Sequence, residues 1–129
     1  MIQRIQSIFL LIVVLCGVGA IAFVQYNENA LSDDEILFMC FQLLNFISIL
    51  LAAIAVFLYK NRIPQIKLCA WIIALNVFLI LSVIFLVRYQ IINQLWAIFF
   101  PLASTVSSFL ARRYIKKDEE LVRSADRIR

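Results

Sequence analysis

Long uncharged stretches alternate with short polar segments along this chain. The four stretches contain 23, 24, 20 and 23 residues and cover positions 5–27, 36–59, 68–87 and 89–111. About 20 apolar residues, rising about 1.5 Å each, span a hydrocarbon core about 30 Å thick. The pattern predicts four transmembrane helices, at residues 7–24, 33–59, 64–87 and 91–111.

Local signals support two of these helix starts. Ser32 and Glu35 form a capping box, in which each side chain can bond to the backbone N–H of the other residue. Pro64 suits a first helical position, where its missing N–H costs nothing. Short connections force neighbouring helices to run antiparallel. We therefore expect an all-α, up-down-up-down four-helix bundle at residues 1–111 and a charged cytosolic helical tail at residues 112–129.

Composition excludes an ordinary soluble domain. Hydrophobic residues make up 64% of the chain and charged residues 16%, against about 45–50% and about 25% in soluble proteins. The chain has no His, which removes the common general base and the usual zinc and haem ligand. No charged residue lies in the middle of a predicted span. Proton-coupled exporters of this size need an embedded carboxylate, so the sequence does not fit that class of transporter. We expect no enzyme activity, no catalytic residues, no cofactor and no metal site.

The distribution of basic residues predicts the orientation in the membrane. One lies before the first span, none in the first connection, three in the second, one in the third and seven in the tail. With both termini in the cytoplasm, 11 of the 12 lie inside, as the positive-inside rule requires. The Tyr and Trp residues then fall near the membrane surfaces, outer for Tyr26, Tyr89 and Trp96, and inner for Tyr59, Trp71 and Tyr114.

Two features of the apolar spans have simple structural interpretations. Cys16, Cys40 and Cys69 are far apart in sequence, so they are expected to be small core residues rather than a redox or metal pair. The first span imitates a secretory signal peptide, with Arg4 before an apolar stretch and small residues near its end. Its apolar run continues through Val24, longer than a usual signal core, so we expect it to be retained.

Neutral polar residues are the candidate functional groups within the spans. They are Gln42, Asn45, Asn76, Ser104 and Ser108. One interpretation is that they bond across helices and hold the bundle together, and the other is that they line a pore in an oligomer. Asn45 and Asn76 are at similar depths, so their amides could meet near the midplane.

Small residues also recur along the fourth predicted helix. Ala97, Pro101, Ser104, Ser108 and Ala111 follow one another at spacings of 4, 3, 4 and 3, which places them on one helix face. Such a face allows another helix to approach closely. We expect it to pack inside the bundle, and packing against a partner protein is the alternative.

A second candidate surface is expected on the cytosolic side. It combines the basic hairpin with the tail and consists of Lys60, Arg62, Lys67, Leu121, Val122, Arg123 and Ile128. Glu119 and Arg123 are spaced as a helical ion pair, so a helix is expected here. Its apolar strip could dock onto a protein or lie among anionic lipid headgroups.

The hydrophilic segments resemble a known family. They read MIQRIQ at residues 1–6, YKNR at 59–62 with QIKLC at 65–69, and KKDEELVRSADRIR at 116–129. They are similar to those of a bacterial family of small four-helix integral membrane proteins classed as a domain of unknown function. The resemblance implies the fold and a bacterial cytoplasmic membrane, and it brings no activity, cofactor or catalytic residues.

The sequence therefore favours an accessory, assembly or other interaction subunit of the bacterial cytoplasmic membrane. Its expected partners are anionic lipid headgroups and either another membrane protein or further copies of this chain, with no nucleic acid. The alternative is a small oligomeric channel or facilitator lined by the neutral polar residues.

Overall fold

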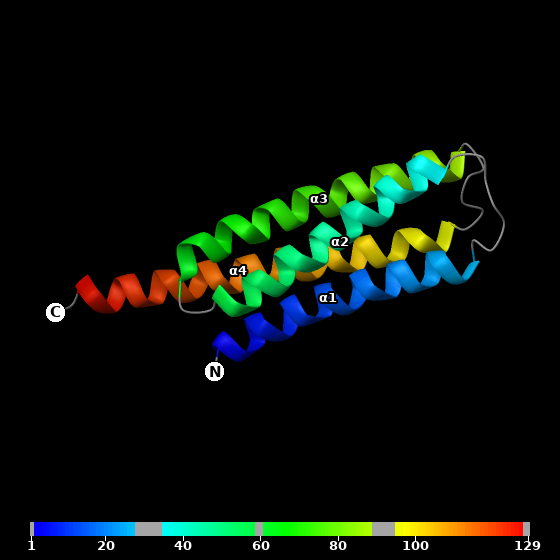
Figure 1. Ribbon diagram of the computed structural model, residues 1–129. Helices are drawn as coiled ribbons and strands as arrows, with labels where there is room; N and C mark the ends of the chain where they lie inside the picture. The colour runs from blue at the N-terminus through cyan, green and yellow to red at the C-terminus, as the bar shows by residue number, and fades with distance from the viewer. Residues whose placement is uncertain (1, 28–34, 59–60, 89–94, 128–129) are drawn as a thin grey trace.

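The protein is a bundle of long helices. Its computed structural model describes residues 2–27, 35–58, 61–88 and 95–127. The helices are α1 (Ile2–Asn27), α2 (Glu35–Phe57), α3 (Arg62–Arg88) and α4 (Phe99–Arg127), and a 3₁₀ turn, η2 (Leu95–Ile98), precedes α4 (Figure 1).

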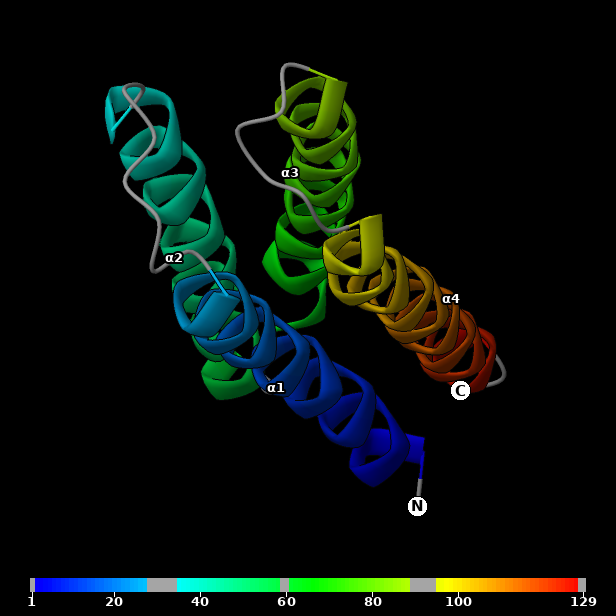
Figure 2. The same cartoon turned by 90° about the vertical axis from the view of Figure 1, so that its right-hand side faces the viewer.

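The four α-helices form a closed ring around one core. α1 packs against α2 and α4, and α3 packs against the same two helices from the other side (Figure 2). In Figure 1 the last turns of α1 and α3 lie at the same end of the bundle as the first turns of α2 and α4. Both ends of the described chain lie at the opposite end, where α4 extends past the first turn of α3.

Each helix contributes one narrow seam to the core. The buried residues follow one another at alternating spacings of 4 and 3: Gln6, Leu10, Val13, Gly17, Ala20 and Val24 on α1; Phe41, Asn45, Ser48, Ala52 and Ala55 on α2; Gln65, Cys69, Ile72, Asn76, Leu79, Val83 and Leu86 on α3; and Ala97, Pro101, Ser104, Ser108, Ala111 and Ile115 on η2 and α4. This heptad spacing keeps one face of each helix toward its neighbours along the whole bundle.

The bundle is more polar inside than on its outward faces. Its buried residues include several amides and hydroxyls, among them Asn45, Asn76 and Ser108. Its outward faces carry large apolar side chains, such as Leu15 on α1 and Phe46 on α2. This arrangement is the reverse of that in a soluble bundle and matches a surface solvated by lipid.

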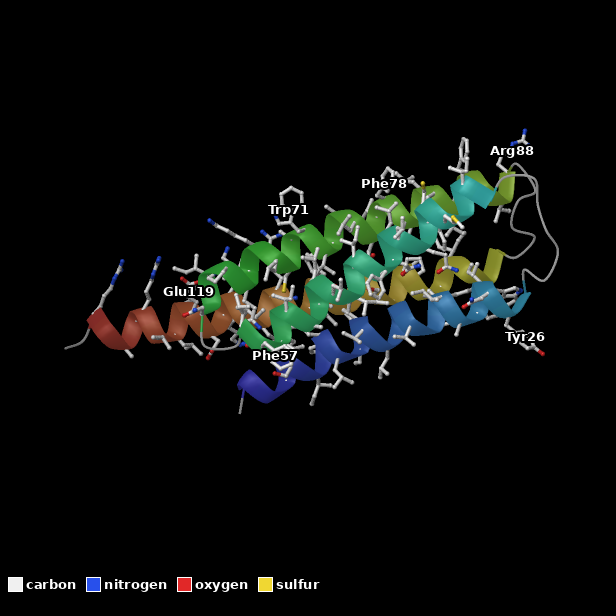
Figure 3. All side chains as sticks on the ribbon, viewed as in Figure 1. Tyr26, Phe57, Trp71, Phe78, Arg88 and Glu119 are labelled. Carbon is white, nitrogen blue, oxygen red and sulfur yellow. The ribbon has the colours of Figure 1, made fainter. Side chains whose placement is uncertain are left out.

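Three helices are long and apolar enough to cross a membrane. Within the described ranges, these segments are Ile5–Tyr26 on α1, Met39–Phe57 on α2 and Ile63–Arg88 on α3. The sequence predicted four, and α4 does not qualify because its charges begin at Arg112, only 13 residues after its first residue, Phe99. The outward side chains of Tyr26 and Trp71 extend away from the bundle (Figure 3).

The helix boundaries differ from those expected from the apolar runs. α1 begins at Ile2 rather than Ser7, and α3 at Arg62 rather than Pro64. The first four N–H groups of a helix have no helical partner, so Pro64 is tolerated as the third residue of α3. Asn61 precedes this helix, and its carbonyl accepts from the N–H of Gln65.

Pro101 explains the late start of α4, which was expected at Ile91. Without an N–H, Pro101 cannot bond to the carbonyl of Ala97, and α-helical geometry begins at Phe99 after the tighter turn η2. Residues 91–94, like Asp33, Asp34 and Tyr59 of the second expected helix, lie outside the described residues. From Phe99 onward α4 runs unbroken to Arg127.

Candidate functional site

The middle of the core is a band of polar and small residues. One apolar cluster includes Leu10 and Ile72, and a second includes Phe41 and Leu79. Along each helix, the seam residues between these clusters are small or polar. We call the polar seam residues, together with the neighbouring Ser107, the central polar band: Asn45, Ser48, Asn76, Ser104, Ser107 and Ser108, all buried.

Hydrogen bonds tie part of this band together. The Asn76 amide nitrogen donates to the carbonyl of Ile72 at 2.8 Å and to the hydroxyl of Ser48 at 3.4 Å. The sequence suggested that Asn76 would meet Asn45, whereas the hydrogen bond joins it to Ser48, one turn along α2. The bond links α2 to α3 through the bundle interior.

Two other polar atoms of the band have no protein partner. Within the part of the chain that the structure describes, neither Nδ2 of Asn45 nor Oγ of Ser108 is hydrogen-bonded, although both atoms are buried. An amide removed from water without a compensating hydrogen bond costs roughly 2–7 kcal/mol, depending on the reference state. The band is therefore incompletely satisfied by the protein alone.

Small residues of η2 and α4 face this interior. The five positions singled out in the sequence, Ala97, Pro101, Ser104, Ser108 and Ala111, are all buried. Thr105 donates to the carbonyl of Pro101 at 2.7 Å, within the same helix. The small-residue face of α4 therefore packs inside the bundle, against α1 and α3.

A second hydrogen bond between α2 and α3 lies at the end of the bundle where α3 begins. Gln65 is buried, and its amide nitrogen donates to the carbonyl of Ala55 at 3.0 Å. Ala55 lies in the last turn of α2, where carbonyls have no helical partner, so Gln65 caps that helix. Gln6 is also buried on α1. Neither residue was predicted from the sequence, although each lies four positions before the next seam residue, Leu10 or Cys69.

Gln42 lies apart from the band. It is half-buried and lines a groove of about 530 Å³ between α1 and α2, together with Ile21, Gln25, Met39, Leu43 and Phe46. A second groove, of about 450 Å³, is lined by aromatic rings of α1, η2 and α4. Both are predominantly apolar, as expected for surfaces in contact with lipid chains.

The described residues of the second candidate surface are exposed. Leu121 and Val122 are 50% and 44% exposed, and Arg123 lies 3.7 Å from Glu119 in an i,i+4 ion pair. Lys67 is exposed on α3. Lys60, Ile128 and the side chain of Arg62 lie outside the described residues.

The groups gathered in the core are neutral. Cys16, Cys40 and Cys69 lie on three different helices and form no disulfide among themselves. Over the described ranges, no three His, Cys, Asp or Glu side chains gather as a metal site would require. The chemistry that the band offers is hydrogen bonding by amides and hydroxyls.

Comparison with known proteins assigns the chain to a family. No curated protein matches it, and no solved structure does. The model of one family, described as a domain of unknown function (DUF4293), matches residues 18–128. This match includes α2, α3, η2, α4 up to its end at Arg127, and residues 18–27 of α1. The chain therefore belongs to the DUF4293 family.

Proposed function

We propose that the protein is a four-span integral membrane protein of the bacterial cytoplasmic membrane, antiparallel, with both termini in the cytoplasm. Its polar interior, its apolar outward faces and the 11-to-1 distribution of basic residues support this topology. The apolar part of α4 is about 20 Å long at about 1.5 Å per residue, and η2 adds about 8 Å at about 2.0 Å per residue. Together they approach the thickness of a hydrocarbon core of about 30 Å.

The proposed role is interaction without catalysis, as an accessory or assembly subunit. The observation that carries it is the continuity of α4, which passes Arg112 and extends beyond the first turn of α3 as one helix (Figure 1). Leu121 lies nine residues beyond Arg112, or about 14 Å along the helix. An amphipathic helix lying flat on the membrane would need a break after Ala111, and α4 has none.

Two parts of the tail then have different partners. Arg112, Arg113, Lys116 and Lys117 are exposed just beyond the apolar part of α4, at the level of anionic headgroups. Leu121 and Val122 lie farther from the membrane, where a cytosolic segment of another membrane protein, or of a further copy of this chain, can cover them.

Mild affinity purification from the native membrane tests this role. The wild-type protein should recover a stoichiometric partner, and Leu121→Asp should lose it. Ser124→Asp is the matched control, because it adds the same charge to the same exposed turn without removing an apolar side chain. Equal recovery with wild type and Leu121→Asp would contradict docking through this strip.

The competing function is an oligomeric channel lined by the neutral polar residues. Burial of Asn45, Asn76, Ser104 and Ser108 within a single bundle argues against it, because an oligomeric pore needs its polar groups on outward faces. Proteoliposomes of purified protein should therefore show no solute flux. Flux that is lost on replacing these residues would favour the channel.

A further inference from the structure

The groove between α1 and α2 has two amides at one level and apolar side chains along the rest of its length. Its volume of about 530 Å³ is within the range of about 300–1,000 Å³ for small-molecule pockets. Gln25 and Gln42 lie at the same level of the two helices, because Val24 and Phe41, the residues that precede them, belong to one apolar cluster. The other lining residues are apolar: Ile21, Met39, Leu43 and Phe46.

The two amides lie near the edge of the hydrocarbon core. Gln25 is the second-last residue of the span-capable segment of α1, and Gln42 is the fourth residue of that of α2. These two segment ends lie at the same end of the bundle (Figure 1). Gln42 is about 4.5 Å inside its segment. Because side chains on a helix lean toward its N-terminus, the Gln42 amide leans back toward the membrane edge.

Apolar side chains line the deeper part of the groove. Ile21 and Phe46 lie four residues, or about 6 Å, farther into the membrane than the two amides. Beyond them α1 and α2 approach closely, since a Cβ added to Gly17 would lie 2.5 Å from Cγ1 of Ile49. The groove is therefore polar at the membrane edge and apolar toward the midplane.

The Gln42 side chain defines the group that fits the polar end. Its Oε1 is buried and has no hydrogen-bond partner among the described residues, which leaves Nε2 as the amide atom for a ligand in the groove. Nε2 is only a donor, so the matching group is an acceptor. The ester carbonyls of a phospholipid are acceptors, and they lie at the edge of the hydrocarbon because they join the acyl chains to glycerol. The described lining residues are neutral, so the charge of the headgroup is not selected.

We propose that this groove binds one ester-linked phospholipid. An ester carbonyl accepts a hydrogen bond from Nε2 of Gln42, and the acyl chain below it lies along Ile21, Leu43 and Phe46. The site rests on the proposed membrane location of α1 and α2, and it needs neither the tail nor a partner protein. Loss of partner recovery in Leu121→Asp would therefore leave it unaffected.

Fluorescence quenching of the full-length protein in vesicles tests the site. Phe46→Trp, with Trp71 and Trp96 replaced by Phe, places the fluorophore in the groove. Brominated diester phosphatidylcholine competes there with unbrominated diether phosphatidylcholine, which has the same headgroup and chain length but no ester carbonyls. A hydrogen bond of about 0.6 kcal/mol corresponds to an about 3-fold preference. The binding constant of the brominated lipid relative to the other lipid should therefore be about 3, and about 1 when both lipids are diesters.

Phe78→Trp, with the same two Trp replacements, is the matched control. Phe78 is exposed on the outward face of α3 (Figure 3) and does not line the groove, so its relative binding constant should be about 1 in both lipid mixtures. A value of about 1 for Phe46→Trp in the diether mixture would overturn the site. Protection of Phe46→Trp from both lipids, with Phe78→Trp quenched, would overturn it in favour of a groove covered by protein, such as a second copy of this chain. Absence of quenching at both positions would instead contradict the membrane location.

Two further variants identify the donor. In the Phe46→Trp protein, Gln42→Leu should reduce the preference for the diester lipid from about 3-fold to about 1. Gln25→Leu removes an exposed amide at the same level and should keep the preference. Quenching of Phe78→Trp in the Gln42→Leu background checks that this variant is still inserted in the membrane. An undiminished preference in Gln42→Leu would exclude Gln42 as the ligand and overturn the site as defined.

Discussion

Asn76 on α3 donates from its side-chain amide to the hydroxyl of Ser48 on α2, across 3.4 Å. The two residues occupy the same level of their seams, because α2 and α3 place Ala52 and Ile72 together in the apolar cluster one turn away. The bond therefore reports the register between the two helices. It also gives α2 and α3 a specific polar contact in the middle of the bundle, where apolar packing alone would allow other registers.

The Asn76–Ser48 bond should appear as energetic coupling. Asn76→Leu and Ser48→Ala should each change the stability in detergent, with a coupling of about 0.6 kcal/mol, typical of interhelical bonds in membrane proteins. Reversible unfolding of the four proteins of a double-mutant cycle measures it. Asn76→Leu combined with Ser82→Ala is the control and should be additive, since Ser82 bonds within its own helix. Additivity in both cycles would contradict the register inferred here.

Gly17 is required where α1 meets α2. A Cβ added there would lie 2.5 Å from Cγ1 of Ile49, closer than van der Waals contact allows. Gly17→Ala should therefore destabilise the bundle, because a strain of about 1–3 kcal/mol exceeds the gain of about 1 kcal/mol in helix propensity. Thermal unfolding in detergent measures the loss.

Ile49→Ala provides the internal check on this steric explanation. It removes the obstructing atoms, so it should be less harmful in the Gly17→Ala background than in the wild type. Val18→Ala, at an exposed position next in the chain, should have little effect. If Ile49→Ala and Gly17→Ala simply add, the close approach of the two helices at this point is wrong.

Gln65 should contribute to the stability of the bundle, although it lies near a connection between two helices. Gln65→Leu would leave the carbonyl of Ala55 without its hydrogen bond, and a buried group left unpaired costs about 1–3 kcal/mol. We expect a lower unfolding temperature and faster hydrogen exchange in the last turn of α2. Gln25→Leu, at an exposed position of α1, is the matched control. Equal effects of the two variants would mean that the cap contributes nothing.

The pattern of uncharged runs predicted the helices of this fold but not the polar contacts between them. The uncharged runs predicted the helices, because backbone N–H and C=O groups in lipid must bond to one another and a helix satisfies them within one segment. The runs could not locate the ends of α1 and α3, because helices continue through charged turns outside the hydrocarbon. They also could not supply the partner of Asn76, which depends on the register between helices. Gln6 and Gln65 were not predicted to be buried because both lie near charged segments. Their heptad spacing from Leu10 and Cys69 places them on the buried faces of α1 and α3.

The proposed topology predicts opposite accessibility of two loops. In a variant lacking Cys16, Cys40 and Cys69, Asn29→Cys should react with an impermeant thiol reagent added outside intact cells. Asn61→Cys, beside the basic residues of the second connection, should react only after the membrane is opened. Labelling of both from outside would contradict cytoplasmic placement of that connection.

The end of α4 should stand away from the membrane surface. Val122 lies ten residues beyond Arg112 on one continuous helix, which corresponds to about 15 Å. A Val122→Trp variant, with Trp71 and Trp96 replaced by Phe, should therefore show no fluorescence quenching by brominated lipids in vesicles that contain anionic headgroups. A second variant that keeps only Trp71, which is exposed on the outward face of α3, should be quenched.

A salt-dependent result would contradict this arrangement. If Val122→Trp is quenched at low salt but not at about 1 M salt, where the Debye length is about 3 Å, then headgroup attraction draws the tail onto the membrane. Leu121 and Val122 would then be covered by lipid, and the docking surface proposed for a partner protein would be lost.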